Sequence, residues 1–290
     1  MTERYYRFAG LEFSVQLPEK LPLLHENRLE PFRVETVTEP HVFRFRTVEA
    51  LAAPVGNCVF RQPSFWVYEE PETEVRYLGV MNNGWENANL RAAHKGKEHL
   101  VELKASWCQD QLPGKILLEA MAAEHLLAEA GGIVFHCSFI DHNGKAVLFT
   151  APSETGKSTQ ADLWNRYRAA EIVNGDRAAI RVTKDGQILA EGIPFSGSST
   201  HCKNRSLPLE AIVYLGQAPK TTIRRMRGYE AFFRLWEGVT VNTWNRKDME
   251  MASDTVRQIA ERIPVYHMPC TPDASAVSVL EQELKKLVSL

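Results

Sequence analysis

The sequence predicts a mixed α/β protein made of a β-rich N-terminal domain, residues 1–108, followed by an α/β domain, residues 109–290. Three observations lead to this fold class. Short β-favouring runs separated by turn residues fill the first domain, residues 145–176 read as strand, loop, helix and strand, and amphipathic helical stretches dominate the C-terminal part. With 290 residues and 44% hydrophobic content, the chain can bury a core in each domain.

The composition excludes several classes of partner. A formal net charge of −2 and a pI near 6.5 provide no field that would hold a polyanion, so we expect neither nucleic acid nor a membrane as a partner. The first residues carry no apolar stretch of signal-peptide length, and no window reaches the roughly 18 apolar residues of a membrane helix. Five scattered cysteines without a CxxC pair do not indicate a zinc or redox site. We therefore expect a cytoplasmic globular protein.

Six β-favouring runs predict the strands of the first domain, mainly in antiparallel order. They are LEFSVQL (11–17), HVFRFRTV (41–48), NCVFRQ (57–62), SFWVYEE (64–70), EVRYLGVM (74–81) and EHLVELKA (98–105). After them, apolar residues at helical spacing predict one helix over residues 113–131, which ends at Gly131-Gly132.

The second domain is predicted to open with a hairpin. Two apolar runs, IVFHCSFI (133–140) and KAVLFTA (145–151), flank Asn143-Gly144, a strong tight-turn signal. The second run leads through a loop to a predicted helix, residues 160–170, and a predicted strand, residues 171–176. The later elements are a hairpin at 181–192, a strand at 209–217, and helices at 229–236, 248–263 and 273–290, the last capped by Asp273.

Residues 151–158, APSETGKS, fit the phosphate-binding loop pattern, with Ala151 in place of the first glycine. In such a loop the backbone N–H groups surround a β-phosphate, Gly156 allows the close approach, Lys157 reaches the β- and γ-oxygens, and Ser158 ligates magnesium. The pattern predicts ATP and Mg²⁺ as cofactors; the alternative is a glycine turn with a solvated lysine. The expected nucleotide-binding residues are Ser153, Glu154, Thr155, Gly156, Lys157, Ser158 and Thr159.

Two further residues are candidates for the chemistry at this loop. Asp176 follows the predicted strand at 171–176 and is expected at its tip, where it would share the metal with Ser158. His136 is expected in the strand that pairs with the one entering the loop, which would bring it near the γ-phosphate. The alternatives are an ordinary aspartate turn and a core histidine.

The order His136, hairpin, APSETGKST (151–159) and VNGD (173–176) resembles the catalytic domain of HPr serine kinase/phosphorylase. That domain shares its P-loop fold with ATP-dependent phosphoenolpyruvate carboxykinase. The resemblance runs from about Leu117 to the C-terminus and is strongest over residues 132–176. It implies an HPr-kinase-like nucleotide-binding domain and, because related enzymes are often oligomers, a possible homo-oligomer.

The resemblance also implies roles for individual residues. Lys157 and Ser158 would hold the triphosphate and the metal, Asp176 would correspond to one of the family's paired aspartates, and His136 would lie near the transferred phosphoryl group. The chain departs from the family because Asp176 is flanked by Gly175 and Arg177 rather than by a second acid, and because Glu154 replaces a usual glycine. The family's arginine-rich C-terminal signature is missing, so HPr itself is not implied as the substrate.

A second segment, residues 192–217, resembles part of HPr-kinase-like and carboxykinase-like bacterial proteins. The residues expected to contact the phosphoryl acceptor or add charge in the transition state are Arg177, Ser198, Ser199, Asn204 and Arg205. The alternative is a surface loop that precedes a core strand.

Three functions fit these patterns. The first is a kinase that transfers the γ-phosphoryl group of ATP to a hydroxyl, such as a serine of a peptide or protein or a small molecule, with Asp176, His136 and Lys157 as catalytic residues. The second is a nucleotide-binding sensor without turnover, which the single acid at Asp176 favours. The third is a carboxykinase-like lyase, for which the sequence shows no obvious ligand set for a second metal.

Overall fold

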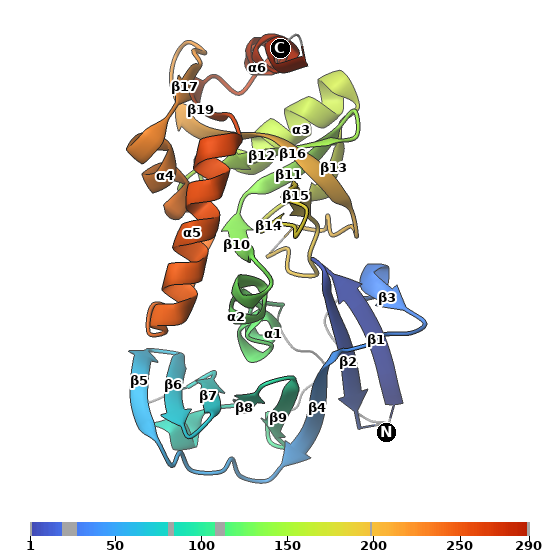
Figure 1. The fold of residues 1–290 in the computed structure, drawn as a ribbon, viewed down its shortest axis with the longest axis vertical. Coiled ribbons are helices and arrows are strands. Elements are labelled where there is room, and N and C mark those ends of the chain that lie inside the picture. The colour runs from blue at the N-terminus through green and yellow to red at the C-terminus, as the bar shows by residue number, and fades with distance from the viewer. Residues whose placement is uncertain (1, 19–27, 81–83, 108–113, 198, 289–290) are drawn as a thin grey trace. The chain divides into compact units, whose positions relative to one another are not determined.

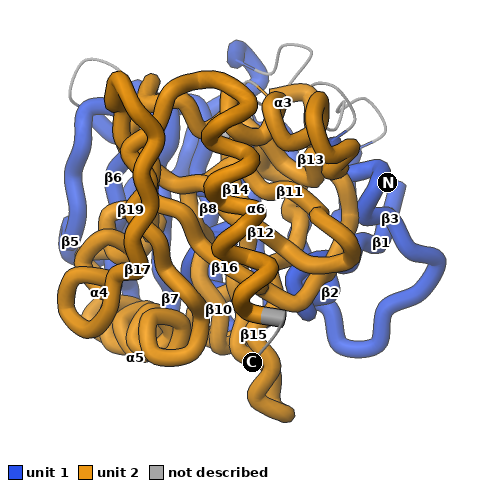
Figure 2. The backbone as a smooth tube through the Cα atoms, turned by 90° about the horizontal axis from the view of Figure 1, so that it is seen from above, with its two compact units in different colours: residues 1–126 blue, residues 127–290 orange. Residues whose placement is uncertain are grey.

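The computed structural model describes residues 2–18, 28–80, 84–107, 114–197 and 199–288. The fold is mixed α/β, with two large mixed sheets, and the chain divides into two compact units, residues 1–126 and 127–290 (Figure 2). The predicted domain boundary at 108/109 lies outside the described residues. Within the described ranges, no helix is both long and apolar enough to cross a membrane.

The first unit is built on a nine-stranded sheet with the order β3-β1-β2-β4-β9-β8-β7-β6-β5 (Figure 1). Its strands are β1 (Thr2–Phe8), β2 (Leu11–Leu17), β3 (Arg33–Val34), β4 (His41–Val48), β5 (Asn57–Gln62), β6 (Phe65–Glu70), β7 (Thr73–Leu78), β8 (Leu90–Lys95) and β9 (Glu98–Lys104), with short 3-10 helices at Glu30–Phe32 and Trp85–Asn87. Each predicted run contains a strand, whereas β1, β3 and β8 were not predicted. The pairing is antiparallel except between β2 and β4 and between β4 and β9.

Three histidines form a chain of ring contacts across β4, β9 and β8. The Nδ1 atom of His41 lies 3.1 Å from Nε2 of His99, and Nδ1 of His99 lies 3.0 Å from Nδ1 of His94. Burial, with a smaller effect of the His41 charge, lowers the pKa of His99 to about 3. Burial and the nearby Arg76 guanidinium hold the pKa of His94 well below its usual value. These two rings are therefore neutral in the folded unit at neutral pH.

The single helix predicted over residues 113–131 is wrong. The structure has two short helices, α1 (Gly114–Ala120) and α2 (Ala123–Glu129), separated at Ala122, which takes a left-handed φ of 50°. A left-handed residue cannot continue a right-handed helix, so the helix ends there. The apolar spacing continues across the break, which is why the sequence reads as one helix.

The second unit is built on a ten-stranded sheet with the path β13-β11-β12-β16-β15-β14-β10-β18, in which β19 also pairs with β16 and β17 with β19. Its strands are β10 (Gly132–His136), β11 (Ser138–His142), β12 (Lys145–Thr150), β13 (Glu171–Asn174), β14 (Arg177–Val182), β15 (Ile188–Glu191), β16 (Ser206–Gln217), β17 (Arg224–Met226), β18 (Val239–Thr240) and β19 (Val265–Cys270), and its helices are α3 (Lys157–Arg168), α4 (Gly228–Trp236), α5 (Arg246–Arg262) and α6 (Ala274–Val288). The pairs β12–β16 and β16–β19 are parallel.

Helices cover both faces of this sheet. One buried cluster joins Val147 and Phe149 of β12 to α3 and α6, and the other joins Ala146 and Leu148 to α4 and α5. Because alternate residues of a strand point to opposite faces, the two helix pairs lie on opposite sides of β12 (Figure 1). The predicted helices and the hairpin at 181–192 are confirmed, whereas β17, β18 and β19 were not predicted.

The run at 133–140 is two strands rather than one. β10 pairs with β14 and β18, whereas β11 pairs with β12 and β13. The expectation that His136 lies in the strand paired with the loop-bearing strand is therefore wrong, because His136 ends β10 and the partner of β12 is β11. The predicted turn at Asn143-Gly144 is confirmed, with φ of 55° and 78° at its two residues, as a tight hairpin turn requires.

Candidate functional site

The phosphate-loop sequence lies between β12 and the start of α3. Gly156 is the N-terminal cap of α3 with a φ of 114°, a conformation that favours glycine, and Glu154 also has a positive φ, 64°. A β-carbon added at Gly156 would meet no atom nearer than 4.0 Å, so its backbone angle and not crowding requires glycine. The first N–H groups of this 12-residue helix have no partner within the helix, and Gly156 provides no side chain to cap them.

Lys157 folds back over its own loop. Its Nζ atom donates hydrogen bonds to the carbonyl oxygens of Ala151, at 3.1 Å, and Pro152, at 3.4 Å, and the residue is 9% exposed. Burial lowers the pKa of the Lys157 ammonium, and the negative charge of Asp176 partly offsets that effect. Neutral carbonyl groups thus hold the Lys157 ammonium inside the loop, and the Asp176 carboxylate is close enough to stabilise its positive charge.

Asn174 holds the turn that carries Asp176. Its buried side-chain oxygen accepts the N–H groups of Asp176 and Arg177, both at 3.0 Å. Its side-chain nitrogen donates to the carbonyl oxygens of Ile193, at 3.0 Å, and Phe195, at 3.3 Å. Sequence reasoning missed this residue, although an asparagine two positions before a polar turn residue is a known turn signal.

The Asp176 carboxylate contacts two cationic or ionisable groups. Its Oδ1 atom lies 3.5 Å from Nε2 of His136, and its Oδ2 atom lies 3.1 Å from Nε of Arg177. Burial alone would raise the pKa of Asp176, but the His136 contact and the Arg177 charge outweigh it and lower that pKa. A β-carbon on Gly197, which has a φ of 53°, would lie 2.8 Å from the carboxylate, so the backbone passes directly beside it.

Hydrogen bonds connect this cluster to the loop-bearing strand. Thr150, the last residue of β12, donates its hydroxyl to the carbonyl oxygen of His136 at 3.0 Å. The N–H of Cys137 donates to the carbonyl oxygen of Asp176 at 3.0 Å, and Arg177 donates to the Thr240 hydroxyl at 3.0 Å. The structure therefore brings His136, Asp176 and Arg177 to the end of β12 at which the phosphate loop begins.

The other predicted residues lie in two places. Ser153, Glu154, Ser158 and Thr159 are exposed in the loop and the first turn of α3, and Thr155 and Gly156 are half-buried. Ser199 packs against the turn before Asp176, since a β-carbon on Gly175 would lie 2.1 Å from its hydroxyl oxygen. Ser198 lies outside the described residues.

Asn204 and Arg205 lie at the opposite end of the strands. The residues that lead to Arg205 run back along β13, where Cys202 pairs with Asn174. Arg205 then forms an ion pair with Asp141 at 2.5 Å and contacts Glu171 at 3.5 Å. Asp141 pairs with Ala146 at the start of β12, away from the loop. The structure does not bring these two residues to the phosphate loop.

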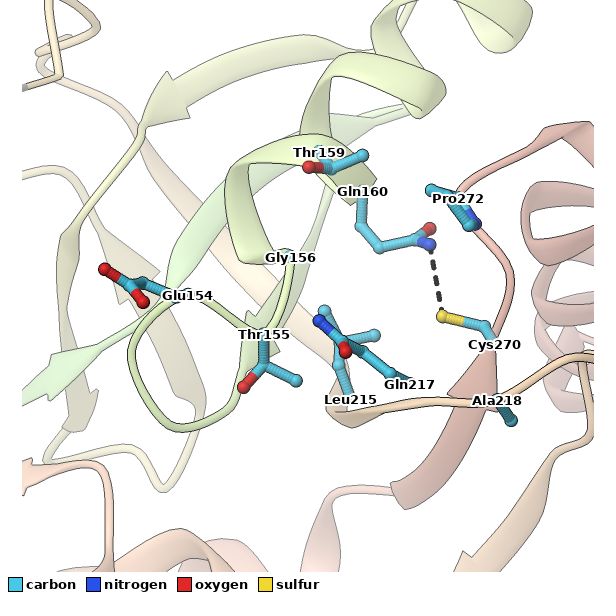
Figure 3. A pocket seen from close by; sticks show the side chains of 10 residues that line it. All are labelled: Glu154, Thr155, Gly156, Thr159, Gln160, Leu215, Gln217, Ala218, Cys270 and Pro272. Atoms are coloured by element: carbon cyan, nitrogen blue, oxygen red, sulfur yellow. Dashed lines mark hydrogen bonds between the residues drawn. The ribbon is translucent and has the colours of Figure 1, made fainter.

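A cavity of about 560 Å³ lies on the other side of the loop (Figure 3). Its lining residues are Glu154, Thr155, Gly156, Thr159, Gln160, Leu215, Gln217, Ala218, Cys270 and Pro272. The volume falls within the range of small-molecule sites. Sequence reasoning missed this cavity because its walls come from α3 and from the ends of β16 and β19, which are far apart in the chain.

Within the described ranges, no group of three or more histidine, cysteine, aspartate or glutamate residues is arranged to hold a metal ion. The hydroxyl of Ser158 and the carboxylate of Asp176 are oxygen donors of the kind that Mg²⁺ prefers. Mg²⁺ usually takes only one or two carboxylates from the protein and completes its shell with phosphate and water oxygens. Ser158 and Asp176 therefore offer donor atoms of the type that Mg²⁺ takes from a protein.

Comparisons with known proteins give a family and a likeness to solved structures. The structure of the HPr(Ser) kinase/phosphatase from Coxiella burnetii is similar at a TM-score of 0.34 and 10% sequence identity, over 53% of this chain and 97% of that chain. No curated protein matches the chain. The family model described as SynChlorMet cassette protein ScmC matches residues 108–285, more than half of the sequence. The chain thus belongs to the family of the SynChlorMet cassette protein ScmC.

Proposed function

We propose that this protein is an ATP-dependent kinase that transfers the γ-phosphoryl group to a hydroxyl, on a serine of a peptide or protein or on a small molecule. The observation that carries the proposal is the arrangement around the loop. The buried Lys157 folds back over the phosphate loop, and Asp176, His136 and Arg177 gather at the end of β12 where that loop begins. Phosphoryl transfer depends mainly on such positioning and on charge neutralisation.

The loop supplies the groups that a triphosphate needs. The N–H groups at the start of α3 and the positive end of the helix favour anions. Lys157 is bonded to two neutral carbonyls, and a phosphate oxygen would be a better partner for its ammonium than either of them. When a triphosphate binds, the Lys157 ammonium would therefore exchange two neutral carbonyl oxygens for charged phosphate oxygens, which form stronger hydrogen bonds.

Asp176 and Ser158 would hold the magnesium ion. The lowered pKa keeps Asp176 ionised at neutral pH, as a metal ligand must be. When bound, the ion neutralises charge on the phosphate oxygens. Arg177 adds positive charge at the same carboxylate, and Asp176 or His136 takes the proton of the acceptor hydroxyl.

Replacing Lys157 tests the triphosphate site. Lys157→Ala should weaken Mg·ATP binding by about a hundredfold, since a charge-assisted contact contributes roughly 1.5 to 3 kcal/mol. Isothermal titration calorimetry measures the affinity, and transfer from γ-labelled ATP to serine-containing acceptors measures turnover. Lys184→Ala, at an exposed position in the β14–β15 hairpin, is the matched control and should bind as the wild type does. An ATP affinity of Lys157→Ala equal to that of the wild type would contradict the proposed function.

A nucleotide-binding sensor is the second candidate, favoured by the single carboxylate at Asp176 between Gly175 and Arg177. Phosphoryl transfer by the wild type separates the two functions, and Asp176→Asn tests whether the carboxylate is needed for it. For a kinase, the variant keeps most of its ATP affinity and loses transfer. A sensor shows no transfer or hydrolysis even in the wild type, and its ATP binding still depends on Lys157.

A further inference from the structure

We propose that the cavity beside α3 binds the adenine base of the nucleotide and that the carboxamide of Gln160 accepts a hydrogen bond from its amino group. This inference rests on the proposed function. Next to β12 in the sheet, β11 and then β13 lie on one side and β16 and then β19 lie on the other. Asp176 follows β13, whereas the cavity is lined from the ends of β16 and β19. A triphosphate whose γ end faces Asp176 would therefore direct its nucleoside toward the cavity.

Gln160 is the polar residue that points to a ligand. It lies in the first turn of α3, is 2% exposed and lines the cavity. Its Nε2 atom donates to the sulfur of Cys270 at 3.3 Å, as Figure 3 shows, whereas its Oε1 atom is buried without a hydrogen-bond partner among the described residues. A buried carbonyl oxygen without a donor is unfavourable. Rotation about the terminal side-chain bond is soft, so this oxygen can turn to meet a donor in the cavity.

The rest of the cavity suits an uncharged flat ring. Among its lining residues only Glu154 carries a charge, and that residue belongs to the loop end. Leu215, Ala218 and Pro272 offer apolar surface to the faces of a ring, and Gln217 offers a second carboxamide. No lysine or arginine lines the cavity, so its chemistry favours a base over another phosphate.

Three ligands test this inference on the intact protein with magnesium present. They are ATP, purine riboside 5′-triphosphate, which lacks the amino group, and inorganic tripolyphosphate, which lacks the base. We expect the wild type to bind ATP about tenfold more tightly than purine riboside triphosphate, the loss of roughly one hydrogen bond. Gln160→Met keeps the length of the side chain but removes the carboxamide. The affinity of this variant for ATP should fall to its affinity for purine riboside triphosphate, and its affinity for tripolyphosphate should equal that of the wild type.

Cysteine alkylation gives a second readout that needs no variant. ATP should slow the alkylation of Cys270, which lines the cavity, whereas tripolyphosphate should not. Cys58, an exposed thiol of the first unit, is the internal control and should react equally in all samples.

The outcomes separate this inference from the proposed function. If the wild type binds neither ATP nor tripolyphosphate, the proposed function and this inference are both overturned. Lysine-dependent ATP binding that is unaffected by Gln160→Met, with Cys270 unprotected, would overturn only the base site. Binding of GTP as tight as that of ATP would overturn the assignment to adenine.

Discussion

Single residues fix the geometry around Asp176. Asn174 uses its oxygen and nitrogen to join the aspartate turn to the backbone at Ile193 and Phe195. Gly197 then passes so close to the carboxylate that no side chain fits between them. The position of Asp176 thus depends on residues about 20 positions further along the chain, which no local pattern shows.

Gly197→Ala should impair transfer more than binding. Its β-carbon would lie 2.8 Å from the Asp176 carboxylate, which must move away. We expect transfer from γ-labelled ATP to fall by about tenfold, the effect of roughly 1.4 kcal/mol on the barrier, with little change in ATP affinity. Kinetic and calorimetric measurements separate the two effects.

Gly186→Ala is the control for backbone strain. Gly186 also has a positive φ, 84°, but a β-carbon there meets nothing within 4 Å. Both variants should lose about 1 kcal/mol of stability from the left-handed conformation. Equal transfer rates in the two variants would show that contact with Asp176 does not matter.

At the level of elements, the loop and its flanking strand and helix could be predicted because their signals are local. β12, the turn at Asn143-Gly144 and α3 follow from a short apolar run, a turn pair and a glycine before a lysine. The division of residues 133–140 at Cys137 could not be predicted, because only the pairing partners distinguish β10 from β11. The expectation that His136 lies near the γ-phosphate rested on a wrong strand pairing, and its contact with Asp176 was not predicted.

The histidine chain across β4, β8 and β9 predicts acid sensitivity of the first unit. In the unfolded chain histidines take up protons below a pKa near 6.5, whereas folded His99 does so only near pH 3. Protons therefore favour unfolding between these values, by about 1.4 kcal/mol per pH unit for each such histidine. The stability of the wild type should fall as the pH decreases from 6.5 toward 3.

Chemical denaturation at several pH values measures this slope. His99→Gln should reduce it, and His201→Gln, at an exposed position in the second unit, should leave it unchanged. The interpretation fails if His99→Gln and the wild type lose stability equally with acid. Differences between variants are compared because other groups also titrate in this range.

For the whole molecule, the division into two units predicts where a nucleotide stabilises the chain. A ligand bound to the folded second unit at a hundredfold excess over its Kd adds about 2.7 kcal/mol to that unit's stability. Hydrogen exchange should show slower exchange over the strands and helices of residues 127–290 and no change in the nine-stranded sheet. Equal protection of both units would show instead that they unfold together.

The global arrangement was less accessible from sequence than the local elements. The mixed α/β class followed from the order of runs, but the parallel neighbours of β12 and β16 come from distant segments. The cavity illustrates the same limit, because Gln160 meets Cys270 across 110 positions of the chain. Sequence patterns identified the phosphate-loop motif, and only the fold revealed the cavity beside it.

The position of β19 sets an order of assembly during synthesis. The hairpin that leads into the phosphate loop is complete once residue 150 has been made, and α3 follows within 18 residues more. The cavity cannot close before Cys270 and Pro272 have left the ribosome, because they form one of its walls. A nascent chain therefore possesses the loop and α3 once residue 168 has been made, but the cavity only once residue 272 has followed.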